Sequence, residues 1–147
     1  MSHKKAKIRF DVVLLLLLVL VIGAFAIFAV RQQSPESAAQ EFMIALATKD
    51  VRRLTELSHL ESPIAPLEEQ WDFCVNNAAK NYVFVWKWVG TVLTEEDRSV
   101  LKVDVYSFSG PFPELPDPFE FPLIKVDGQW KVDLQSLTRR FFPALPR

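Results

Sequence analysis

The side chains that could support catalysis or metal binding are few in this sequence. It contains two histidines, His3 and His59, and one cysteine, Cys74. A single cysteine forms no intramolecular disulfide and supports no zinc-finger site, so Cys74 is expected to be a small core residue. His59 stands where a short helix is expected to end, and a surface position suits it better than a catalytic one. We therefore predict no metal site.

The acidic side chains suggest no catalytic pair either. A helix from Leu67 would place Asp72 about 100° away from Trp71 and so toward solvent. Asp104 and Glu120 fall on the polar faces of two expected strands. The sequence has no glycine-rich phosphate loop, no nucleophile elbow and no metal-ligand spacing. We predict a non-enzymatic protein without a cofactor.

An apolar stretch near the start predicts the cellular location of the protein. Residues 12–30 carry no charge and are long enough, as a helix, to cross a bilayer core. Residues 1–31 hold five basic side chains and one acidic one, whereas the rest of the chain holds 12 basic and 17 acidic ones. Because basic flanks stay in the cytoplasm, we predict a single-pass anchor in the cell membrane with the C-terminal domain outside. The alternative is a secreted domain, released by signal cleavage at Ala24-Phe25-Ala26.

Three helices are expected after the anchor. Ser34-Pro35-Glu36 has the form of a helix start, with a hydroxyl cap, a proline at the first position and an acid in the first turn. Asp50 is the expected cap of a shorter second helix. From Leu67 the apolar spacing describes a third amphipathic helix.

Four strands are expected next. Aromatic residues alternate with smaller ones from Tyr82, and Gly90 is the expected site of a bulge. A second strand returns over residues 101–105. A proline-rich loop, residues 109–118, leads to a third strand, residues 119–126, which contains Pro122, a residue typical of an edge or bulge. Asp127-Gly128 predicts a two-residue hairpin into the last strand.

This order predicts an α+β domain in which three helices pack on one face of a four-stranded antiparallel sheet. The acidic domain gives no electrostatic reason to bind nucleic acid. The expected core residues are Phe42, Leu46, Trp71, Cys74, Trp86, Val103 and Trp130. The expected divisions are a basic leader (1–11), a transmembrane helix (12–30), a linker (31–34), a domain (35–138) and a tail (139–147).

Two segments resemble a known family. Residues 35–50 are similar to the opening helix of NTF2-like domains, and residues 126–133 are similar to their last hairpin, especially in small membrane-tethered DUF4878-like members. The resemblance implies a cystatin-like cone, in which a strongly curved sheet wraps around the first helix and leaves a pocket. It also implies that the outer sheet face often forms a dimer.

Two functions follow as hypotheses. We predict first an interaction or scaffold module that binds a second copy or another envelope protein, because the outer sheet face carries more apolar residues than a solvent-exposed face should. The interface residues would be Val83, Val85, Val89, Tyr106 and Phe108. The alternative is a domain that binds a small apolar ligand in the cone. Its pocket would be lined by Phe42, Leu46, Trp71, Tyr82, Trp86 and Trp88.

Overall fold

The computed structural model describes residues 13, 15, 17–20, 33–108, 111 and 114–147, in two compact units that divide after Gln33. The predicted transmembrane stretch, 12–30, lies largely outside the described residues. Within the described residues, no helix combines the length and the apolar character that crossing a membrane requires. The leader (1–11) and the first two residues of the linker, 31 and 32, also lie outside the described residues.

The helices begin where the sequence predicts. The Ser34 hydroxyl accepts a hydrogen bond from the backbone N–H of Ser37 at 3.2 Å, and the Asp50 carboxylate accepts one from Arg53 at 3.0 Å. Both helix caps are therefore confirmed. The third helix differs from the prediction, because its second half is a π-helix. The helices are α2 (Pro35–Thr48), α3 (Val51–Leu57), α4 (Leu67–Phe73) and the π-helix η1 (Cys74–Ala78).

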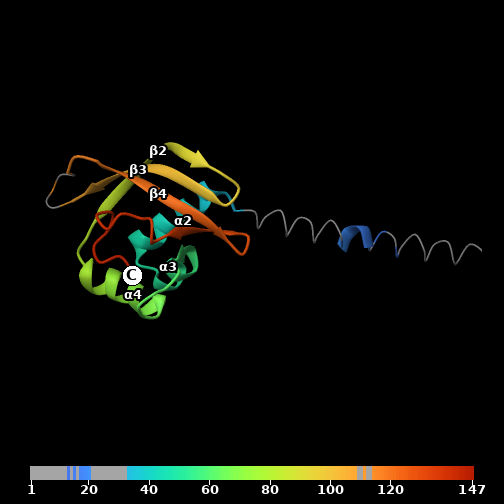
Figure 1. The fold of residues 1–147 in the computed structure, drawn as a ribbon, viewed down its shortest axis with the longest axis horizontal. Helices are drawn as coiled ribbons and strands as arrows, with labels where there is room; N and C mark the ends of the chain where they lie inside the picture. The colour runs from blue at the N-terminus through green and yellow to red at the C-terminus, as the bar shows by residue number, and fades with distance from the viewer. Residues whose placement is uncertain (1–12, 14, 16, 21–32, 109–110, 112–113) are drawn as a thin grey trace, which may run out of the picture. The chain divides into compact units, whose positions relative to one another are not determined.

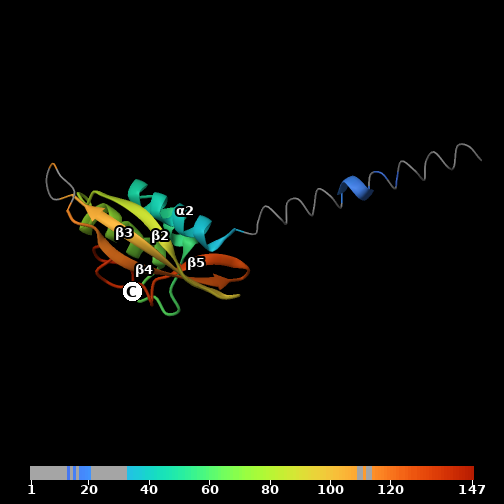
Figure 2. The same cartoon turned by 90° about the horizontal axis from the view of Figure 1, so that it is seen from above.

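The sheet has five strands rather than the predicted four. The additional strand is two residues long, pairs in parallel with the last strand, and makes an otherwise antiparallel sheet mixed. The sheet order is β1-β5-β4-β3-β2, and α2 lies against the sheet in both views (Figures 1 and 2). The strands are β1 (Ser58–His59), β2 (Phe84–Thr94), β3 (Arg98–Ser107), β4 (Asp117–Val126) and β5 (Gln129–Asp133).

Turns and irregularities follow local chemistry. Asp127 and Gly128 both have positive φ, 51° and 77°, as a two-residue hairpin of the favoured hand requires. The register of β2 shifts on either side of Gly90, which confirms the predicted bulge. Pro122 pairs with Val100 of β3, whereas β5 pairs with β4 only from Leu123 onward. Pro122 therefore has a neighbouring strand on one side only, as is usual for a proline within a strand.

The core lies between the sheet and the helices. Six of the seven expected core residues are buried, whereas Trp86 is half-buried at the margin. The side chains that alternate on the inner face of β3 and β4 pack against α2, and Phe42 of that helix contacts the rings of Trp71 and Phe121 edge-on. The cone predicted from the family resemblance is thus filled by its own side chains.

The C-terminal segment, expected to be a tail outside the domain, belongs to this core. Phe141 lies edge-on to Phe119 with 5.3 Å between ring centroids, and Phe142 meets Tyr82 at 5.2 Å. The Gln70 side chain donates to the carbonyl and accepts from the N–H of Arg147. Figure 1 shows this red segment between β4 and α4.

Candidate functional site

The predicted ligand pocket is largely solid. Phe42, Leu46 and Trp71 are at most 2% exposed and pack against their neighbours in the core. The indole N–H of Trp71 donates to the Ser58 hydroxyl at 2.9 Å, and that hydroxyl donates to the carbonyl of Leu54. These side chains have packing and polar partners within the chain, as a structural core requires.

The two tryptophans of β2 have a shared partner on α2. The indole N–H groups of Trp86 and Trp88 both donate to the side-chain oxygen of Gln40, at 3.3 and 2.7 Å. Both rings are half-buried, and Trp88 lies edge-on to Phe121. This pairing closes the gap between helix and sheet, and it explains why Trp86 remains at the margin of the core.

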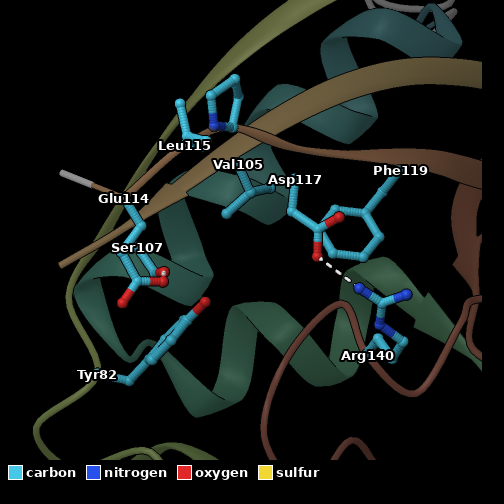
Figure 3. Close-up of a pocket in the computed structure, with 9 residues that line it drawn as sticks. Tyr82, Val105, Ser107, Glu114, Leu115, Asp117, Phe119 and Arg140 are labelled. Carbon is cyan, nitrogen blue, oxygen red and sulfur yellow. Dashed lines mark hydrogen bonds and ion pairs between the residues drawn. The ribbon is translucent and has the colours of Figure 1, made fainter. Parts of the chain in front are cut away.

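A cavity of about 320 Å³ lies at one end of the cone, and of the six predicted pocket residues Tyr82 lines it. We name it the mouth pocket (Figure 3). Strand register explains its position. The last residue of β3, Ser107, pairs with Phe84, and the first residue of β4, Asp117, pairs with Val105. At this end of the sheet, polar side chains therefore replace the apolar ones on the inner faces of β3 and β4. The lining residues are Tyr82, Val105, Ser107, Glu114, Leu115, Pro116, Asp117, Phe119 and Arg140.

The polar groups of the mouth pocket are held by specific contacts. The Ser107 hydroxyl donates to the Glu114 carboxylate at 2.9 Å, and the Arg140 guanidinium pairs with Asp117 at 3.1 Å. Burial of the phenol, together with the negative charges of Glu114 and Asp117, raises the pKa of Tyr82 above its usual value. Tyr82 therefore stays protonated at neutral pH, and Figure 3 shows its hydroxyl directed toward the cavity.

Sequence reasoning missed four polar members of this pocket: Ser107, Glu114, Asp117 and Arg140. Asp117 carried a usable pattern, because it alternates with Phe119 and Phe121 on one face of β4. The predicted strand began two residues too late, at Phe119, because Pro118 suggested a loop. No local pattern brings Arg140 from the C-terminal segment to this strand.

The outer face of the sheet is the second candidate site. Val83, Val85 and Val89 expose 60%, 49% and 55% of their surface, whereas Tyr106 and Phe108 are half-buried. Tyr106 is the cross-strand partner of Val85, so the two lie side by side on this face. An apolar surface of this kind on a sheet is typical of an interface. The interface itself stays a prediction.

A charged band crosses the same face beside these residues. Lys87 pairs across the strands with Asp104, and Lys102 pairs with Glu120, so two basic and two acidic side chains alternate there. A shallow hollow of about 300 Å³ lies at the band, with Val89 and Pro118 among its lining residues. The outer face thus combines an apolar end, a band of charged residues with no net charge, and a shallow hollow.

The remaining chemically capable residues are dispersed. His59 lies in β1 rather than at a helix end, and exposed Asp72 accepts a hydrogen bond from Asn76. Burial raises the pKa of the Cys74 thiol to about 12, and the thiol donates to the carbonyl of Pro143. In the part of the chain that the structure describes, no three His, Cys, Asp or Glu side chains are grouped to hold a metal ion.

Comparison with known proteins identifies the fold. No family model and no curated protein matches the sequence. A crystal structure from Thiobacillus denitrificans, described as a calcium/calmodulin-dependent protein kinase type II association domain, is 16% identical over 67% of this chain and 89% of that one, with a TM-score of 0.52. The solution structure of a SEC-C motif containing protein from Rhodopseudomonas palustris is 18% identical over 69% and 77%, with a TM-score of 0.51. At these identities the likeness shows the fold alone.

The domain is therefore an α+β domain of the NTF2-like fold, as the two sequence segments predict. The finer resemblance to membrane-tethered DUF4878-like proteins stays a prediction. Fold alone does not assign an activity, because one fold carries many functions.

Proposed function

We propose that this chain is a non-enzymatic interaction module that self-associates through the outer face of its sheet. The observation that carries the proposal is the exposure of three valines, Val83, Val85 and Val89, beside a charged band of zero net charge. Burial of apolar surface drives association, and the band sets the orientation of the partner.

A second copy of the domain is the partner that this face suits best. A face that carries both basic and acidic residues can pair with a copy of itself across a two-fold axis, if the axis places the basic residues of one copy opposite the acidic residues of the other. Lys87 and Lys102 of one copy then approach Asp104 and Glu120 of the other. The hollow beside Val89 offers space for an apolar side chain of the second copy. The description of the Thiobacillus denitrificans protein as an association domain is consistent with this function.

Charge reversal on the band tests self-association. The Lys87→Glu variant gives each copy an excess of two negative charges on the band, and Asp104→Lys gives an excess of two positive ones. We expect each variant alone to be monomeric in sedimentation velocity, because like charges meet at the interface. An equimolar mixture should form heterodimers, because the two bands then attract each other.

Two controls decide the interpretation. The Glu96→Gln variant, changed in the turn between β2 and β3, should sediment as a dimer like the unmodified protein. Val85→Asp should produce monomers, because it places a charge in the apolar end. An unmodified chain that sediments as a monomer at high concentration, both as residues 34–147 and at full length, contradicts the proposal.

We further propose that residues 12–30 hold the module at the cell membrane, with the domain outside. The uncharged stretch and the basic leader support this arrangement. A phosphatase reporter that is active only outside the cytoplasm, fused after Arg147, should be active in intact cells. The chain should also stay in the membrane fraction after carbonate extraction. A mature N-terminus near Ile27 would instead establish a secreted domain released by signal cleavage.

The alternative function, capture of an apolar ligand inside the cone, has less support. The predicted lining residues Phe42, Leu46 and Trp71 are buried in the core, and rings from α2, β4 and the C-terminal segment fill the space between helix and sheet. An apolar ligand would have to displace these packed side chains.

A further inference from the structure

The mouth pocket combines features that the core and the outer face lack. It is a cavity of about 320 Å³ at which five polar side chains converge: Tyr82 from the segment before β2, Ser107 from β3, Glu114 from the segment between β3 and β4, Asp117 from β4, and Arg140 from the C-terminal segment. A concave pocket with a few convergent polar groups is the usual form of a small-molecule site. It lies on the inner side of the sheet, so it is separate from the proposed interface on the outer face.

The charge of the lining favours a cation. Glu114 and Asp117 each contribute a carboxylate, and Arg140 contributes one guanidinium, which already pairs with Asp117. The lining therefore has one net negative charge. Carboxylates form their strongest hydrogen bonds with charged donors such as ammonium groups.

The remaining surface suits an apolar body. A hydrophobic wall borders the carboxylates, with buried Val105 and Phe119 at its base and exposed Leu115 and Pro116 at its rim. The phenol ring of Tyr82, stacked on Phe84, closes the cavity near Ser107. Aromatic rings also attract cations through their faces. A ligand with a charged amino head and a compact hydrophobic group would use both parts of the lining.

We propose that the mouth pocket binds a small organic ammonium ion, with its charged head at the Glu114 and Asp117 carboxylates and its apolar body against the hydrophobic wall. The expected class is a primary arylalkylamine or alkylamine. Self-association through the outer face is not required for this binding.

Three probes of nearly equal size test the charge requirement. Full-length protein labelled with ¹⁵N is titrated with 2-phenylethylammonium, with the neutral 2-phenylethanol and with the anion phenylacetate. We expect saturable shifts of the backbone amides of Ser107, Glu114 and Asp117 with the ammonium ion. The alcohol should bind about tenfold more weakly or not measurably, because it lacks the charged donor.

Two variants should change the affinity in opposite directions. Glu114→Gln removes one negative charge and should raise the Kd of the ammonium ion about tenfold. Arg140→Gln removes the positive charge that pairs with Asp117 and should lower the Kd about threefold. A loss of packing would weaken binding in both variants, so the opposite signs distinguish an electrostatic site from a structural effect.

Glu96→Gln, which makes the same change of charge in the β2–β3 turn, is the matched control and should leave the Kd unchanged. The proposal is overturned if phenylacetate binds as tightly as the ammonium ion, or if Glu114→Gln leaves the Kd unchanged. If Glu114→Gln fails to fold, Arg140→Gln decides, and an unchanged or raised Kd in that variant overturns the proposal. A monomeric protein that still binds the ammonium ion would contradict only the proposed self-association.

Discussion

Replacing Phe141 by alanine is expected to lower the free energy of unfolding by about 3–5 kcal/mol, the usual cost of removing a fully buried phenylalanine side chain. Phe141 is 2% exposed, and its ring lies 5.3 Å from that of Phe119 and 5.4 Å from that of Phe121. The change leaves a void between the C-terminal segment and β4. Urea denaturation followed by circular dichroism measures the effect.

Phe73→Ala is the matched control, because this ring is 58% exposed on α4. The same chemical change there should cost about 0.5 kcal/mol or less. A loss below about 1 kcal/mol for Phe141→Ala would mean that the C-terminal segment does not pack in solution as it does here.

Local chemistry made much of this fold predictable. The caps at Ser34 and Asp50 and the hairpin at Asp127-Gly128 are each decided within three or four residues, so the sequence contains all the groups that form them. The bulge at Gly90 belongs to the same class. Strand and helix periods likewise predicted most of the core.

Long-range packing determined the features that the sequence did not reveal. The segment after Leu137 contains two prolines and no regular period, yet Phe141 and Phe142 are buried because rings on distant strands surround them. The parallel pair of β1 with β5 is only two residues long and depends on where α3 ends. Neither feature has a pattern of its own in the sequence.

The candidate sites divide in the same way. The apolar character of the outer face was predictable, because Val85 and Tyr106 occupy strand positions at which a solvent-exposed face would carry polar residues. The mouth pocket was not, because it combines the end of one strand, the start of another and a guanidinium from the C-terminal segment. Trp86 was expected in the core and is half-buried, since its indole N–H reaches Gln40 at the margin.

Trp71→Ala is expected to destabilise the domain by a similar amount, about 3–5 kcal/mol. Trp71 is completely buried and packs edge-on against Phe42, with 5.7 Å between the ring centroids. Its indole also donates the hydrogen bond to Ser58, so the loss has a packing part and a polar part. Chemical denaturation of single and double variants separates the two.

Ser58→Ala alone should cost about 1–3 kcal/mol, because it leaves the buried indole N–H of Trp71 without an acceptor. Trp71→Phe removes that N–H but retains an aromatic ring. In the Trp71→Phe background, Ser58→Ala should therefore cost less than in the unmodified protein, since no buried donor is left unpaired. The difference between the two costs is the interaction energy of the pair. Equal costs in both backgrounds would show that the Trp71–Ser58 bond contributes no stability, and that packing in the core accounts for the whole loss in Trp71→Ala.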